Sequence, residues 1–327
     1  MKKFNWYMIS KNRDAVYALA IICIMIFHCK SPKNIEGGLQ ILHSFKLMGN
    51  LGVDIFLFVS GISLYFAITK NSSWKRFYIN RLKRVWIPTI IVLSVCYLYF
   101  VRDRRILSYI TYVTGIDMFI KDSLVIWFIT CITVCYILYY FVYRLYLRTN
   151  WSIWALVAAL AVSIGFNAVM SYAFPEFWKS TEIMWRRIPI FLVGSYMGKA
   201  VYDKKESRLS YVHVALLVII SIISVFVWDS FIADYVSKRY LYLVMAVIFS
   251  MFFSIIGEVK QLGPVFRWLS PLTLEIYLVH ERIIDALKMK HMDNNLLIMN
   301  MIAIVCALVV AKLLLTFEDK VIYRKNK

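Results

Sequence analysis

Two ionisable side chains lie inside the first two apolar stretches of the chain. His28 is near the end of residues 14–31, and Asp54 lies within residues 47–68. Such groups cost a few kcal/mol each in hydrocarbon, so they mark a functional site by default. If the two stretches are antiparallel neighbours joined by a short outer loop, His28 and Asp54 lie at similar depth. A histidine with a supporting carboxylate is suited to taking a proton from a hydroxyl group.

A third apolar stretch, residues 268–287, carries more ionisable side chains, among them His280 and Glu281. A single histidine within a membrane helix is as often a structural hydrogen-bonding group as a functional one. Three stretches with ionisable groups at a common level instead favour a polar cavity. His280 is therefore a third candidate catalytic residue, either as a donor to a developing oxyanion or as a contact to the second substrate.

The basic run over residues 70–84 ends with Arg81 and Arg84, which are three residues apart and lie on one side of a helical turn. A solvated cytoplasmic loop would explain the positive charge alone, since Lys and Arg collect on that side of a membrane. Paired guanidinium groups at a membrane surface would also bind a phosphate-rich ligand. The sequence leaves both interpretations open.

The composition predicts how these residues are positioned. The chain has 327 residues, of which 61% are hydrophobic, and a mean hydropathy of +0.67. Apolar stretches of about 20 residues recur, each long enough to cross a bilayer. We therefore expect an all-α membrane protein with about ten transmembrane helices in one bundle, forming a single domain over residues 1–327. The expected spans are 15–31, 47–68, 86–101, 124–143, 152–172, 187–202, 210–228, 240–257, 268–287 and 296–317.

The net charge of +19 fits this topology better than it fits nucleic-acid binding. Lys and Arg are more numerous in the loops on the side of the termini, so both termini are expected in the cytoplasm. Residues 106–120 are semi-polar and are expected to form an outer interfacial or re-entrant segment. The six cysteines lie in or beside apolar stretches and suggest neither a disulfide framework nor a metal site.

Taken together, these motifs resemble the acyltransferase 3 family of integral-membrane acyltransferases. The matching segments follow one another along most of the chain: LAIICIMIFH, LGVDIFLFVSGISLYF, FYINRLKR, VIWFITCITVCYILYY, RRIPIFLVGSYMG and LSPLTLEIYLVHE. The resemblance implies a fold of about ten helices around a site that acyl-CoA reaches from the cytosol. It also implies transfer of acetyl or other acyl groups to extracytoplasmic glycans.

One position departs from the family pattern. The family typically has an arginine eleven residues before the histidine, and this chain has Tyr17 there. Asp14 matches the acidic position that often precedes that arginine. Arg13 lies one turn earlier and could reach the same area with its long side chain. Either Arg13 and Tyr17 together steer the donor, or this branch handles its donor differently or has lost activity.

We therefore expect O-acyl transfer, with acetyl as the favoured group, from acyl-CoA to a hydroxyl of a surface or secreted glycan or a lipid-linked sugar. His28 would be the general base, Asp54 would orient its imidazole, and Arg81 and Arg84 would bind the donor phosphates. No permanently bound cofactor or metal is expected. The protein would be a multi-pass protein of the plasma (inner) membrane, working beside glycan-assembly enzymes.

A different class, a transporter or flippase of lipid-linked sugars, could use the same polar cavity. A glycan polymerase or ligase is a third possibility. Transporters commonly contain internal repeats with matching broken helices, and no such repeat is visible in the sequence. Dependence on an acyl thioester would separate the enzyme from the transporter.

Overall fold

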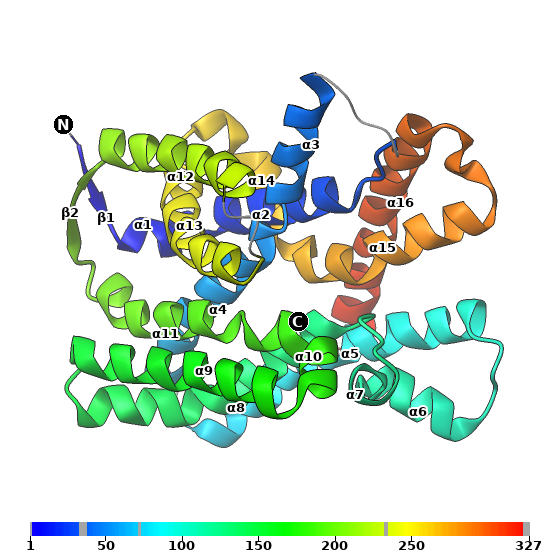
Figure 1. The fold of residues 1–327 in the computed structure, drawn as a ribbon, viewed down its shortest axis with the longest axis horizontal. Helices are drawn as coiled ribbons and strands as arrows, with labels where there is room; N and C mark the ends of the chain where they lie inside the picture. Colours follow the sequence, from blue (N-terminus) through cyan, green and yellow to red (C-terminus); the bar gives the residue numbers. More distant parts are fainter. Residues whose placement is uncertain (1, 33–37, 71–72, 232–234, 323–327) are drawn as a thin grey trace. The chain divides into compact units, whose positions relative to one another are not determined.

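The computed structural model describes all residues except 1, 33–37, 71–72, 232–234 and 323–327, and it is almost entirely helical (Figure 1). Each of the expected spans overlaps a helix, although the bounds differ. Among the described residues, six helices are long and apolar enough to cross a membrane. They comprise Leu42–Lys70, Trp74–Phe100, Trp127–Arg148, Ile153–Ala173, Arg239–Ile256 and Leu296–Val321, and a shorter apolar helix covers Tyr211–Val227. The count of ten crossings and the side of the termini stay predictions.

The chain forms two compact units, which are described separately. The first unit comprises Met1–Arg13 and Asp54–Ile255, and the second comprises Asp14–Val53 and Ile256–Lys327. The single-domain organisation expected from the sequence stays a prediction.

The first unit is mainly helical and contains one short sheet. Its strands β1 (Lys3–Asn5) and β2 (Glu206–Ser210) pair antiparallel, an element that the sequence did not predict. Its helices are α1 (Tyr7–Lys11), most of α4 (Leu51–Lys70), α5 (Trp74–Phe100), α6 (Ile106–Thr114), α7 (Asp117–Ile120), α8 (Trp127–Arg148), α9 (Ile153–Ala173), α10 (Pro175–Trp185), α11 (Ile188–Tyr202), α12 (Tyr211–Phe231) and α13 (Tyr235–Ile256).

A close crossing of α4 and α11 organises the first unit. A Cβ atom on Gly194 would lie 2.1 Å from the carbonyl oxygen of Phe58, so only glycine allows this approach. Small residues let helix backbones come together in this way in membrane proteins. The crossing brings the first turns of α4 and the start of α11 into one core.

From Trp74 on, the basic run is helical. Ser73 caps α5 by accepting a hydrogen bond from the backbone N–H of Arg76 at 3.4 Å, and the helix runs from Trp74 through Pro88. The expected span over 86–101 therefore begins a dozen residues too late. The residues after it, 106–120, fold into the short helices α6 and α7.

The second unit packs α2 (Arg13–His28) with the helices that follow Ile256. Its other elements are α3 (Gly38–Met48), the 3-10 turns η1 (Lys260–Leu262), η2 (Ser270–Leu272) and η3 (Met292–Asn294), the helices α14 (Gly263–Leu269), α15 (Thr273–Met289) and α16 (Leu296–Phe317), and the π-helical turn η4 (Glu318–Ile322). A Cβ on Gly52 would lie 2.4 Å from the carbonyl oxygen of Ala20, so α2 and the first turn of α4 touch backbone to backbone.

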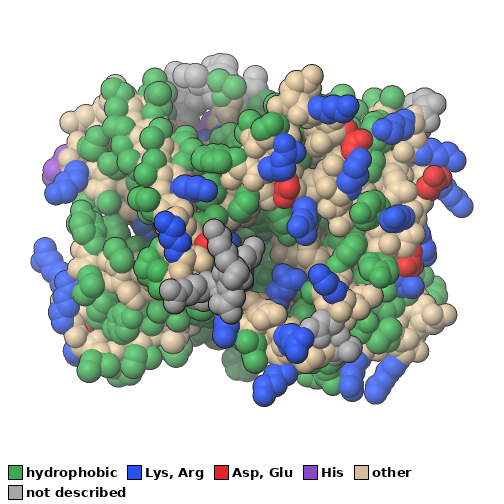
Figure 2. All heavy atoms as spheres, turned by 180° about the vertical axis from the view of Figure 1, so that it is seen from behind, with side chains coloured by type: hydrophobic (Ala, Val, Ile, Leu, Met, Phe, Trp, Pro, Cys, Tyr) green, Lys and Arg blue, Asp and Glu red, His purple; other side chains and the backbone are tan. Residues whose placement is uncertain are grey.

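Apolar side chains remain exposed on several helices. Only 17% of the most apolar window of α9 is buried, and only 22% of that of α16. Figure 2 shows hydrophobic side chains over much of the face it presents, with Lys and Arg between them. Exposed apolar surface of this extent is suited to contact with lipid.

Candidate active site

His28 forms a hydrogen-bonded pair with a carboxylate in the second unit. Its Nδ1 lies 3.1 Å from Oε1 of Glu281 on α15. Because a carboxylate accepts hydrogen bonds, this contact places the proton of the neutral imidazole on Nδ1 and leaves Nε2 as the basic atom. The His28 side chain is 24% exposed, so a substrate can reach it. The arrangement is that of a general base held by an acid partner.

His280 stands next to this pair, with its ring centre 4.9 Å from that of His28. Its Nδ1 lies 3.0 Å from the carbonyl oxygen of Ile276 and 2.9 Å from that of Tyr277. Since carbonyl oxygens only accept, Nδ1 carries the proton, and Nε2 of the neutral ring is an acceptor. That buried Nε2 has no hydrogen-bond partner among the described residues. His280 can therefore accept a hydrogen bond from a substrate hydroxyl, whereas donation to an oxyanion would require a second proton.

Both ends of α2 are fastened within the second unit. At its start, Asp14 accepts a hydrogen bond from Ser270 Oγ at 2.9 Å. Beyond its end, the Asn300 side chain accepts from the backbone N–H of Lys30 and donates to its carbonyl, both at 2.8 Å. A cavity of about 10 Å³, the size of one water molecule, lies beside Asn300 and His280. These contacts keep α2, and with it His28, from sliding along the helix axis relative to the rest of the second unit.

Asp54 pairs with a buried arginine. In the first unit, its Oδ1 accepts a hydrogen bond from Nε of Arg187 at 3.2 Å, and both side chains are buried. The Arg187 guanidinium also lies 4.5 Å from the ring centre of Trp127. Within the second unit, the partner of His28 is Glu281, which the sequence did not select. Whether Asp54 also orients the His28 imidazole stays a prediction, because the two residues belong to different units. The other oxygen of Asp54, Oδ2, is buried without a described partner.

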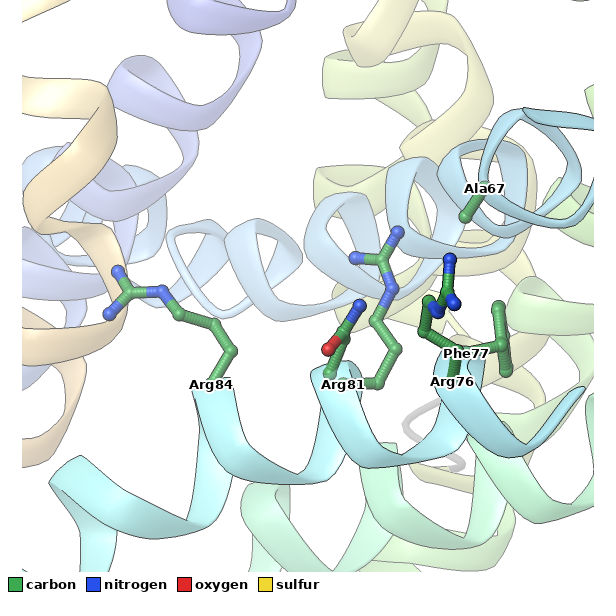
Figure 3. A pocket seen from close by; sticks show the side chains of 6 residues that line it. Ala67, Arg76, Phe77, Arg81 and Arg84 are labelled. Atoms are coloured by element: carbon green, nitrogen blue, oxygen red, sulfur yellow. The ribbon is translucent and has the colours of Figure 1, made fainter. Parts of the chain in front are cut away.

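Arg81 and Arg84 line a pocket of about 300 Å³ in the first unit, formed by α5 and the end of α4. Arg76, Phe77, Asn80 and Ala67 complete its wall. Figure 3 shows the guanidinium groups of Arg76 and Arg81 pointing to the same space beside Ala67, while Arg84 extends away along α5. Three arginines and no acidic side chain line this pocket, which is suited to a ligand with several phosphates.

Arg13 and Tyr17 are the first and fifth residues of α2. They are therefore one turn apart on the same helix, as expected. Arg13 is exposed and Tyr17 is half-buried. The structure holds no donor, so their joint role stays a prediction.

Three functional candidates were not selected from the sequence. Glu281 directly follows His280, and its proximity to a second histidine was the available signal. Arg187 precedes a proline at the start of an apolar helix, where an arginine also suits a membrane interface. Arg76 belonged to the basic run but does not share the three-residue spacing of Arg81 and Arg84.

Metal binding finds no support in the parts of the chain that the structure describes. No group of three or more His, Cys, Asp or Glu side chains there could hold an ion, and all six cysteines are free.

The fold is that of a helical membrane protein, and in its second unit a partly exposed histidine contacts a carboxylate. A family model described as an acyltransferase domain matches residues 14–317, and the chain belongs to this family, acyltransferase 3. The protein is accordingly an acyltransferase. No curated protein matched in a search of such sequences, and no solved structure matched either.

Proposed function

We propose that the protein transfers an acyl group, acetyl in the first instance, from acyl-CoA to a hydroxyl of a surface or secreted glycan or a lipid-linked sugar. The observation that carries this proposal is the contact between His28 and Glu281, which leaves the Nε2 atom of an accessible histidine ready to accept a proton. A thioester is already an activated acyl donor, so the reaction mainly requires a better nucleophile.

The proposed reaction has two proton movements. His28 Nε2 takes the proton of the sugar hydroxyl as its oxygen attacks the thioester carbon. The C–S bond then breaks, and the imidazolium returns the proton to the departing CoA thiolate. Glu281 stabilises the imidazolium through the Nδ1–H hydrogen bond. His280 would accept a hydrogen bond from the acceptor and so hold the sugar beside His28.

We assign the donor phosphates to the arginine pocket. CoA carries a diphosphate and a 3′-phosphate, and Arg81 and Arg84 would form charge-assisted hydrogen bonds to them from the cytosolic side. This orientation goes together with cytoplasmic termini and a multi-pass position in the plasma membrane.

Replacing Arg81 or Arg84 with alanine is expected to raise the KM for acetyl-CoA about tenfold or more, since each variant loses a charge-assisted contact. Acetyl-pantetheine, which lacks the nucleotide phosphates, should be affected much less. Steady-state kinetics with both donors measures the difference. Lys75→Ala, an exposed change on the same helix outside the pocket wall, is the matched control. Equal losses with both donors would reassign the arginines to a structural role.

Arg13→Ala is expected to remove most of the activity if Arg13 and Tyr17 together replace the family arginine. Adding Tyr17→Arg should then restore a good part of it, because the new guanidinium stands at the usual position. The measurement is acyl transfer by the single and double variants at equal membrane levels. Unchanged transfer in Arg13→Ala would limit Arg13 to anchoring α2 at the lipid headgroups.

The test of the proposed function is transfer by the purified protein from labelled acetyl-CoA to glycan, detected by mass spectrometry. Formation of an O-acetylated sugar that requires the thioester supports acyl transfer. Movement of a lipid-linked sugar across vesicles without any thioester would instead support a flippase.

A further inference from the structure

Two lysines meet beside the His28–Glu281 pair in the second unit. Lys30 follows His28 by two residues, and its side chain contacts that of Lys288 on α15. Lys288 is seven residues after Glu281, which places it on the same face of α15, about 10 Å further along the axis. The two ammonium groups and the proton-accepting site therefore lie along one side of α15.

The acidic side chains of this region already have partners. Arg282 lies 3.3 Å from Asp285 and 3.6 Å from Glu281, and Glu281 also holds His28. Glu281 and Asp285 also attract the Lys30 ammonium group, but Arg282 shares both carboxylates, so the cations of this region outnumber its carboxylates. Two like charges in contact repel each other, and an anion between them would replace that repulsion by attraction.

The preference of Lys and Arg for the cytoplasmic side of a membrane does not explain why Lys30 and Lys288 lie here. In the orientation expected from the sequence, the His28 end of α2 faces away from the cytoplasm, where the positive-inside bias disfavours Lys. A third lysine, Lys46, is half-buried in the same unit and donates a hydrogen bond to Ser31 Oγ at 2.9 Å. The excess positive charge thus gathers near His28 at the end where the glycan would arrive.

We propose that Lys30 and Lys288 bind a carboxylate or phosphate on the acceptor, so that the acyl group goes to an anionic glycan. The separation between the lysine pair and Glu281 along α15 is comparable with one or two sugar units. An anion held by the lysines thereby places a hydroxyl of the same or the neighbouring sugar at His28. This inference rests on the proposed function, in which His28 acts on the acceptor.

The test compares two acceptors that differ only in charge. Methyl glucuronide and methyl glucoside are titrated against the purified protein in zwitterionic nanodiscs, with binding followed by saturation-transfer NMR. The wild type should bind the glucuronide about tenfold more tightly, and Lys30→Gln with Lys288→Gln should remove the preference. Lys290→Gln, an exposed change near the end of the same helix, should keep it. Glucose 6-phosphate, as a further ligand, distinguishes a phosphate from a carboxylate.

Three results would overturn the inference. These are equal binding of all the sugars by the wild type, loss of the preference in nanodiscs containing phosphatidylglycerol, and weaker acetyl-CoA binding by the double variant. The second would assign the lysines to lipid headgroups and the third to the donor. Because binding is measured apart from turnover, a preference for the anionic sugars without any transfer would refute the proposed function and leave the anion site standing.

Discussion

His28→Ala is expected to lower acyl transfer by about two to four orders of magnitude, the usual contribution of a general base. The imidazole is the group that removes the hydroxyl proton in the proposed reaction, and its Nδ1 is already held by Glu281. Transfer from labelled acetyl-CoA by purified protein, with mass spectrometry of the glycan, measures the effect.

The companion variant is Glu281→Gln. An amide can keep a hydrogen bond to Nδ1 but cannot stabilise an imidazolium by charge, so the rate should fall while the KM for the donor changes little. His291→Asn serves as a control, because His291 is exposed and its φ of 55° is one that asparagine tolerates. Normal acetylation by a folded His28→Ala protein would reject the mechanism.

The second large effect concerns stability. Arg187→Met is expected to destabilise the protein by about 3–5 kcal/mol, because it leaves the buried carboxylate of Asp54 without its charged partner. Replacing both partners, Asp54→Leu with Arg187→Met, should recover much of that loss, since a buried apolar pair needs no compensating charge. Thermal unfolding in detergent, followed by tryptophan fluorescence, measures both changes.

The control for this pair is Lys199→Met. Lys199 forms an ion pair with Asp203 one turn later at 3.0 Å, but both side chains are about one-third exposed. Loss of such a surface pair should cost about 1 kcal/mol or less. Equal destabilisation by Lys199→Met and Arg187→Met would show that the buried Asp54–Arg187 pair contributes no more to stability than an exposed pair. Activity of the folded double variant also tests whether Asp54 takes part in catalysis, as the sequence led us to expect.

The helices could be located from the sequence because each buries apolar residues over a length set by the bilayer. His28 and Asp54 could be selected because a charged or titratable group in such a stretch is rare. The start of α5 could not be located, because its first three turns are basic and were interpreted as a loop. The helix begins at the Ser73 cap. The strands β1 and β2 were missed for a similar reason, because each is only a few residues long.

The contacts that His28 and Asp54 make were harder to predict than their positions in the sequence. Hydropathy places His28, Asp54 and Glu281 at approximate depths but gives no rotation of one helix against another. The contact between His28 and Glu281 depends on how α2 and α15 face each other, and Asp54 meets Arg187 because Gly194 lets α11 approach α4. Both are results of tertiary packing, which a single sequence does not specify.

The hydrogen bonds at both ends of α2 have a consequence for side reactions. Asp14 and Lys30 are held by hydrogen bonds at the two ends, so His28 is aligned with Glu281 before any sugar arrives. A base that is already in place and partly open to solvent can activate water as well as a hydroxyl group. In the proposed reaction, acetyl-CoA bound in the absence of acceptor would therefore be hydrolysed, at a rate that falls as glycan occupies the site.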